Sequence, residues 1–348
     1  MDTDELLCVD IWDQRQVKRR FIETLTSSPN KFKDIFIFTQ NEMEYDLVFD
    51  EFVYPLLGHY VENSSINVDL ITSLVDEKPN VKKYKGLNIH FWPTYWLYKT
   101  YGSLQPLYDD RLNLRQQTDG LKYHFIMMNN RCHRFRCELI DKIAEQDLLK
   151  FSAYTWNNRD AFLMDDYIFK WFDGKTKTFN DNFTTTGGQY HVPIEYFQSF
   201  AQLISESTPH KLFFSEKIST ALIVGKPFIA AAGQRIHAYL RDVLGFKLYD
   251  EIFDYSFDDE PDMNKRWDMI TDNFKRLSTY TLKELESLQL KIQDKIAFNQ
   301  LRVLEIMQDI NFMPPPIQKS FQLYKEGTYL NHGLSLAFSQ IGKLVQIG

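Results

Sequence analysis

Residues 211–246, with the sequence KLFFSEKISTALIVGKPFIAAAGQRIHAYLRDVLGF, alternate short apolar runs with helical patterns and decide the fold class. Residues 212–214 predict a short strand. Residues 216–224 predict a helix that ends at Gly225, because a residue without a Cβ suits a left-handed helix cap. Residues 227–232 predict the next strand.

The same alternation continues on both sides of this stretch. A helix is expected over residues 234–243, with Gly245 as its C-terminal stop. Upstream, residues 123–128 predict a strand and residues 134–149 a helix, whereas the apolar spacing of residues 194–204 is helical. Successive strand–helix pairs of this length favour one parallel sheet.

The first half of the chain also has an α/β pattern. Strands are expected at residues 6–10, 34–39 and 87–92, with a helix at 15–25. Because 348 residues exceed what one hydrophobic core usually organises, we expect two domains. The polar stretch at residues 101–120 is typical of a connection between them.

The composition excludes several classes of protein. Hydrophobic residues make up 44% of the chain, and 40 Lys and Arg against 47 Asp and Glu give a net charge of −7. That charge provides no general attraction for a polyanion. No stretch approaches the roughly 18 apolar residues of a membrane helix, and the acidic start lacks the layout of a secretory signal. We therefore expect a cytoplasmic protein without a membrane span.

The cysteine pattern indicates neither disulfides nor a metal site. Cys8, Cys132 and Cys137 fit reduced thiols. Although His133 follows Cys132, the spacing to Cys137 matches no common zinc pattern, so no metal site is predicted.

Ser215, Glu216 and Lys217 lie where a predicted strand gives way to a helix. A helix N-terminus presents free N–H groups and a partial positive charge, which suit a diphosphate. Lys217 would add a full charge, and Glu216 would accept hydrogen bonds from ribose or sugar hydroxyls. The alternative is structural, with Ser215 as an N-cap and Glu216 as a favourable first-turn acid.

The order and spacing of the surrounding motifs resemble the donor-binding half of a family of GT-B-type glycosyltransferases from bacteria and large DNA viruses, and more distantly the fucosyltransferases. That family has an acidic residue, a Thr/Ser-Glu-Lys turn, an apolar helix, a Lys-Pro-Phe-Ile strand, and Leu-Gly-Phe before an Asp-Tyr-Ser tail. The matching positions in this chain are Glu206, Ser215-Glu216-Lys217, Lys226-Pro227-Phe228-Ile229, Leu244-Gly245-Phe246, and Asp254-Tyr255-Ser256 with Asp258.

The resemblance implies both an architecture and an activity. It implies two Rossmann-like domains that face a cleft: an acceptor-side domain at residues 1–117 and a donor-binding domain at 118–280. The C-terminal helix and tail at 281–348 would pack back on the first domain. The activity implied is transfer of a sugar from a UDP- or GDP-sugar to an acceptor hydroxyl, with no further cofactor and no metal ion.

Residues 129–136 also resemble this family, in the loop that follows the first strand of the donor domain. Their arginines favour a diphosphate, because a guanidinium binds phosphate oxygens with two parallel hydrogen bonds. On this resemblance Arg131 and Arg134 are expected to be phosphate ligands. A solvated basic turn is the alternative.

The mechanism is expected to be inverting, because Glu206 and Glu216 are ten positions apart, farther than the paired glutamates of retaining relatives. An inverting transfer needs a general base for the acceptor hydroxyl, which we expect from the other domain. Asp13, just after the first strand, is the first candidate, with a helix cap as its alternative interpretation. The further candidates are Asp109, Asp110 and His90.

Two further groups of residues have a functional and a structural interpretation. Trp92, Tyr95 and Trp96 form either an aromatic platform for an acceptor or a half-buried core edge. The acidic pairs Asp258-Asp259 and Asp165-Asp166 lack the strand-end setting of a metal-dependent transferase, so we expect them to be solvated.

Two other functions stay open. A viral DNA glycosyltransferase that acts on hydroxymethylated bases would need a basic groove and a flipped base. Lys82, Lys83 and Lys85 permit it, whereas the net charge of −7 disfavours it. A non-catalytic nucleotide- or carbohydrate-binding protein would keep Glu216 and Lys217 but lack a base.

Overall fold

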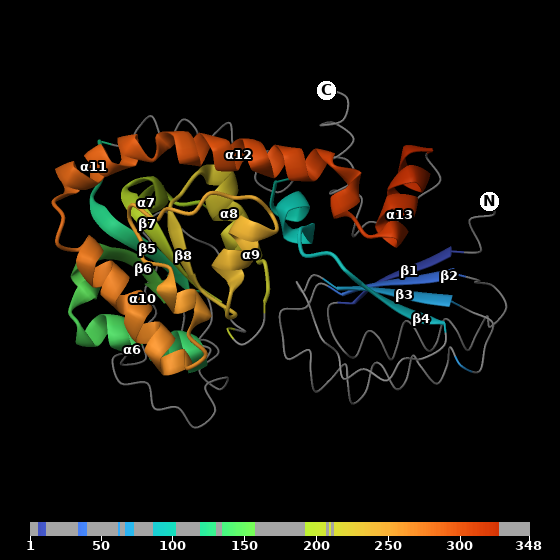
Figure 1. The fold of residues 1–348 in the computed structure, drawn as a ribbon, viewed down its shortest axis with the longest axis horizontal. Coiled ribbons are helices and arrows are strands. Elements are labelled where there is room, and N and C mark those ends of the chain that lie inside the picture. The colour runs from blue at the N-terminus through green and yellow to red at the C-terminus, as the bar shows by residue number, and fades with distance from the viewer. Residues whose placement is uncertain are drawn as a thin grey trace. The chain divides into compact units, whose positions relative to one another are not determined.

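The computed structural model describes residues 6–11, 34–39, 62, 67–72, 86–101, 119–129, 134–156, 192–206, 209 and 212–326. These residues form a mixed α/β structure with parallel sheets, consistent with a Rossmann-like fold (Figure 1). The chain divides into two compact units, residues 1–98 with 307–348 and residues 99–306. Of the predicted domain connection at 101–120, residues 102–118 lie outside the described residues. No helix in the described part is long and apolar enough to span a bilayer.

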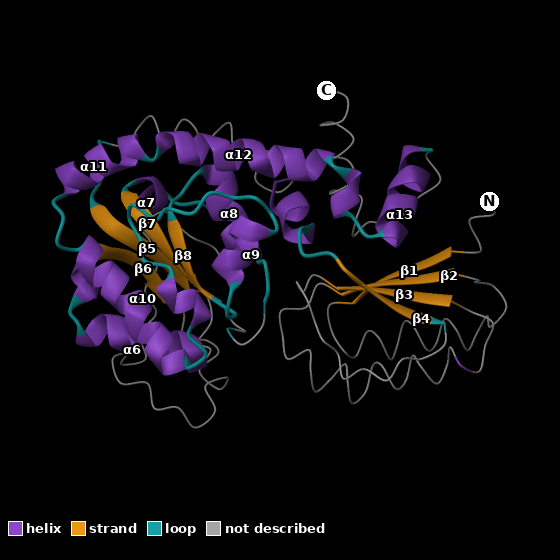
Figure 2. Cartoon of the chain, viewed as in Figure 1, coloured by secondary structure: helices purple, strands orange, loops and turns teal. Residues whose placement is uncertain are grey.

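The first unit contains a four-stranded sheet in the order β1-β2-β3-β4, with every neighbouring pair parallel (Figure 2). Its strands are β1 (Leu6–Ile11), β2 (Asp34–Thr39), β3 (Asn67–Thr72) and β4 (Leu87–Phe91). The strands expected at 6–10, 34–39 and 87–92 are confirmed to within one residue. β3 was not predicted from the sequence, although its apolar residues Val68 and Ile71 are fully buried.

The aromatic cluster after β4 belongs to the hydrophobic core. Trp92 and Tyr95 are fully buried, Trp96 is nearly so, and the rings of Trp92 and Tyr95 lie 5.3 Å apart. Tyr98 packs on the same Trp92 ring, with a centroid distance of 5.5 Å. The interpretation of these rings as an acceptor platform is therefore wrong, because no exposed face remains for a sugar.

The second unit contains a parallel sheet in the order β6-β5-β7-β8. Its strands are β5 (Tyr123–Asn129), β6 (Ser152–Trp156), β7 (Ser199–Ser205) and β8 (Phe228–Ala231). In Figure 1 the sheet lies between α6 (Arg134–Glu145) and α10 (Met263–Leu277) on one side and α11 (Leu282–Lys291) and α12 (Gln293–Gln308) on the other.

Two local predictions in this unit were wrong. The helix expected over residues 194–204 is a single turn, α7 (Ile194–Phe197), followed by β7. Every residue of β7 is buried, so its apolar residues show no alternation that would mark a strand. The strand expected at 212–214 is reduced to one bridge residue, Phe213.

The helix–strand stretch that decided the fold class is otherwise confirmed. α8 (Glu216–Val224) ends at Gly225 and is followed by β8, and α9 (Ile236–Asp242) ends before Gly245. Both glycines have a left-handed backbone, with φ of 80° and 76°. The N–H of Gly225 donates to the carbonyl of Ala221 at 3.0 Å, which closes the helix.

The C-terminal helical region is divided more finely than predicted. The apolar spacing of the sequence predicts one helix from about Leu282 to Met307, ended by the three prolines at 314–316. The structure instead has two helices, α11 and α12, which meet at Ile292. The three prolines at 314–316 do not simply end a helix, because Pro315 begins α13 (Pro315–Lys325). Proline suits the first helical turn, where its missing N–H would have no helical partner.

Candidate functional site

The sheet of the second unit changes winding direction at β5. The chain passes from β5 to β6 on one side and returns to β7 on the other side of β5. In open parallel sheets, ligands bind outside the carboxyl ends of the strands at such a point. Asn129 ends β5, and Ser205 and Glu206 end and follow β7, so these three residues mark that place.

The ends of β5 and β7 are joined by polar contacts. The hydroxyl of Ser205 donates to the carboxamide oxygen of Asn129. The buried Arg136 of α6 donates through Nε to the carbonyl of Ser205 at 3.0 Å. Asn129 is itself buried, and its Nδ2 has no hydrogen-bond partner among the residues that the structure describes. A buried amide donor at this position is suited to a ligand acceptor.

Glu206, Ser215, Glu216 and Lys217 come together as one group, here called the Glu206 cluster. The hydroxyl of Ser215 donates to Glu206 Oε1 and accepts the N–H of Lys217 at 3.1 Å. Lys217 Nζ lies 2.8 Å from Glu216 Oε1 and 3.3 Å from Glu206 Oε2. Four residues expected at the donor site thus contact one another, at the end of β7 and the start of α8.

The structural interpretation of Ser215 is confirmed, because it is the N-cap of α8. The same hydroxyl also contacts Glu206, so the cap and the cluster share one side chain. The side chains of Glu206 and Glu216 are 1% and 5% exposed and that of Lys217 is 19% exposed. One ammonium group therefore lies between two buried carboxylates, and removing it would leave them facing each other.

The other predicted site residues do not belong to the Glu206 cluster as the structure describes it. Arg134 is the first residue of α6, half exposed, and donates through Nε to Glu138 at 2.8 Å. His90 lies in the first unit, where its Nε2 is 2.7 Å from Asp69 Oδ1. The remaining candidates lie outside the described residues: Arg131, Asp13, Asp109 and Asp110.

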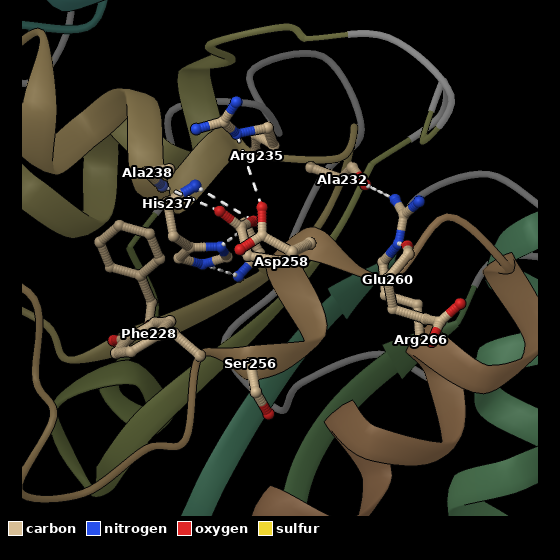
Figure 3. Close-up of polar contacts among 12 residues, drawn as sticks. Phe228, Ala232, Arg235, His237, Ala238, Ser256, Asp258, Glu260 and Arg266 are labelled. Atoms are coloured by element: carbon tan, nitrogen blue, oxygen red, sulfur yellow. Dashed lines mark hydrogen bonds and ion pairs between the residues drawn. The ribbon is translucent and has the colours of Figure 1, made fainter.

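The expectation that both Asp258 and Asp259 are solvated is wrong for Asp258. Asp258 is buried and lies 2.9 Å from Nδ1 of His237, whereas the side chain of Asp259 is 81% exposed. Figure 3 shows the contact between Asp258 and His237. Burial alone would raise the pKa of Asp258, but hydrogen bonds from the His237 ring and from two backbone N–H groups outweigh it and lower the pKa.

His237 and Arg266 were not singled out from the sequence as functional residues. Both are buried, and both contact the backbone at the end of β8 (Figure 3). The sequence signal that points toward His237 is the resemblance at Asp258, its hydrogen-bond partner. In the described ranges, no group of three or more His, Cys, Asp or Glu side chains is arranged to hold a metal ion.

No family model, curated protein or solved structure matches this chain.

Proposed function

We propose that this chain is a glycosyltransferase that moves a sugar from a nucleoside-diphosphate sugar to an acceptor hydroxyl, by inversion and without a bound metal ion. The observation that carries this proposal is the position of the Glu206 cluster. It lies at the carboxyl end of a parallel sheet, beside the strand at which the winding direction changes. This is where Rossmann-like sheets bind nucleotides.

The chemistry of the cluster supports a ligand with hydroxyls next to phosphates. Carboxylates accept hydrogen bonds from ribose and sugar hydroxyls. Glu206, directly after β7, and Glu216, in the first turn of α8, supply two carboxylates. The N-terminus of α8 adds a partial positive charge that favours a diphosphate. Asn129, at the end of β5, adds a buried amide donor for a base or phosphate oxygen.

Lys217 would act within this site by balancing charge. Since its ammonium group already contacts both carboxylates, a bound diphosphate would share it with Glu206 and Glu216. Arg131 and Arg134 are the proposed additional phosphate ligands. For the base that takes the acceptor proton, Asp13 remains our first candidate, followed by Asp109, Asp110 and His90.

The test is calorimetric titration with UDP, GDP and their sugars, in the presence of a chelator. We expect binding of at least one nucleoside diphosphate that survives the chelator. Lys217→Ala should weaken it about tenfold or more, the effect of losing a hydrogen bond to a charged group. An unchanged affinity in Lys217→Ala would remove this lysine from the site, and no binding at all would reject the proposed function.

A matched control is available in the same unit. Lys295 also lies beside two carboxylates, 2.8 Å from Glu251 and 3.8 Å from Asp250, and its side chain is 26% exposed. Lys295→Ala removes a comparable charge away from the sheet edge. It should leave nucleotide affinity unchanged, which separates a site effect from a general effect on charge.

A further inference from the structure

The end of β8 is held at three successive residues. The N–H of Ala230 donates to Nε2 of His237 at 3.1 Å. The carbonyl of Ala231 accepts the N–H of Glu206 at 3.0 Å. The carbonyl of Ala232 accepts from Nη1 of Arg266 at 3.0 Å. The residue that fixes the backbone of Glu206 therefore lies between two residues held by buried side chains.

Arg266, on the first turns of α10, joins three connecting segments. Besides Ala232, its guanidinium donates to the carbonyl of Glu260 at 2.9 Å and to that of Pro209 at 3.4 Å. Pro209 belongs to the connection that follows β7 and Glu206, and Glu260 to the one that precedes α10. One rigid group thus links the connection that carries Glu206 to the end of the neighbouring strand.

The surroundings of Arg266 indicate a geometric role. The residue is 5% exposed, and burial lowers the pKa of its guanidinium. Its hydrogen bonds go to backbone carbonyls, which do not neutralise its charge. Burial disfavours this charge, and the nearby carboxylates of Asp258 and Glu260 offset part of that effect. A planar group with five donors in fixed directions can, however, hold several carbonyls at once.

The contact between His237 and β8 has a defined protonation pattern. Because the Ala230 N–H donates to Nε2 of His237, that nitrogen carries a lone pair and the ring proton is on Nδ1. Nδ1 then donates to Asp258, which also accepts the N–H of Ala238 at 2.8 Å. Figure 3 shows this pair together with Arg266, whose guanidinium is joined to Ala232.

From these contacts we infer that Arg266 is a positioning residue for the candidate site: by holding Ala232 and Pro209, it sets the place of Glu206 and so of the carboxylates that would bind the donor. This inference rests on the proposed function for the identity of the ligand. Its structural part, the dependence of Glu206 on Arg266, does not need a ligand.

The experiment compares Arg266→Lys with Arg276→Lys. Arg276, on the same helix, donates to the carbonyl of Ile252 at 2.9 Å and to Oδ1 of Asn273 at 2.8 Å. Within the described part of the chain, these hydrogen bonds involve neither β8 nor Glu206. Lysine keeps the charge in both variants but cannot reproduce the planar set of donors. Both variants are first tested for cooperative thermal unfolding. Hydrogen exchange and nucleotide affinity are then measured only on variants that fold.

Two measurements follow, amide hydrogen exchange at Glu206 and affinity for UDP and GDP. In Arg266→Lys we expect exchange at Glu206 to accelerate about tenfold or more relative to amides of α12, and nucleotide affinity to fall by a similar factor, while Arg276→Lys changes neither. If both variants affect Glu206 equally, the positioning role is overturned.

The remaining outcomes test the positioning role and the proposed function separately. Faster exchange at Glu206 with unchanged nucleotide affinity overturns a role in the site, although the proposed function stands. If the unsubstituted protein binds neither nucleotide, the proposed function fails and the donor-site role of Arg266 fails with it. The exchange measurement then reports separately whether Arg266 holds Glu206 in place.

Discussion

The carboxylate of Asp258 lies 2.9 Å from Nδ1 of His237 and also accepts the backbone N–H groups of His237 and Ala238, at 3.2 and 2.8 Å. One side chain thereby fixes both the imidazole ring and the start of α9. Because the other ring nitrogen accepts from Ala230 of β8, this pair connects the 3-10 helix η7 (Ser256–Asp259) to the sheet.

Asp258→Asn is expected to destabilise the protein by about 1–3 kcal/mol at neutral pH, since it disrupts charge-assisted hydrogen bonds in a buried place. Asp259→Asn, at the exposed neighbouring position, should change stability by less than about 0.5 kcal/mol. Urea unfolding of both variants gives the comparison. Equal effects would show that Asp258 contributes no more than a surface acid.

The depressed pKa of Asp258 predicts that the free energy of unfolding depends on pH. Its pKa in the folded protein is below the ordinary value of 3.8, because hydrogen bonds outweigh the effect of burial. A depressed pKa means that the stabilisation is present above the unfolded pKa and lost as pH falls through the folded pKa. Between about pH 5 and pH 2, unfolding free energy should therefore fall less steeply in Asp258→Asn than in the unsubstituted protein. Parallel curves would contradict this.

Gly225 should be intolerant of alanine for two separate reasons. Its φ of 80° is unfavourable for any residue with a Cβ, and an added Cβ would lie 2.6 Å from Cγ2 of Ile296 on α12. We expect Gly225→Ala to cost about 2 kcal/mol or more of unfolding free energy.

Gly245 provides the control, because its φ is 76° but the nearest atom belongs to the flexible side chain of Arg302 at 3.2 Å. Gly245→Ala should cost only about 1 kcal/mol. In a double-mutant cycle, Ile296→Ala should relieve part of the cost of Gly225→Ala. Strict additivity would exclude the steric contribution.

Asn129→Asp tests the amide at the end of β5, whose Nδ2 has no hydrogen-bond partner within the described ranges. The substitution retains an oxygen for the Ser205 hydroxyl but removes the Nδ2 donor and adds a negative charge. If a nucleoside diphosphate binds here, its affinity should fall about tenfold or more, from the lost donor and from repulsion.

Asn299→Asp is the matched control. Asn299 is equally buried, but its Nδ2 donates to the carbonyl of Lys247 at 2.9 Å and to Tyr249 Oη at 3.2 Å. This variant should lose more stability and less nucleotide affinity than Asn129→Asp. If Asn299→Asp lost more nucleotide affinity than Asn129→Asp, the ligand would not bind at Asn129.

The proposed inverting transfer requires a base, and Asp13→Asn should lower turnover by about 100-fold with donor affinity nearly unchanged, because general-base catalysis typically contributes that much. The measurement is the rate of nucleoside diphosphate release from the sugar donor that calorimetry identifies. If Asp13→Asn is fully active and His90→Gln is not, the base is His90.

The sequence by itself determined the elements whose signals are local. The end of α8 at Gly225, the strand β8 and the stop at Gly245 followed from periodicity and from glycines in left-handed caps. These signals need no distant partner, because a helix end is set by its own last turn. The Ser215 cap was likewise readable from its position before an apolar helix.

Other features depend on contacts between residues that are distant in sequence, and only the tertiary structure showed them. β7 was mistaken for a helix because a strand buried on both faces has no polar alternation, and it becomes a strand by pairing with β5 and β8. The sequence around Asp258 and Asp259 predicts two solvated acids, because the partner of Asp258, His237, is 21 positions away and is brought next to it only by the fold. Likewise, Glu206 and Lys217 approach only because β7 and α8 meet at one edge of the sheet, and burial there makes their charges interact strongly.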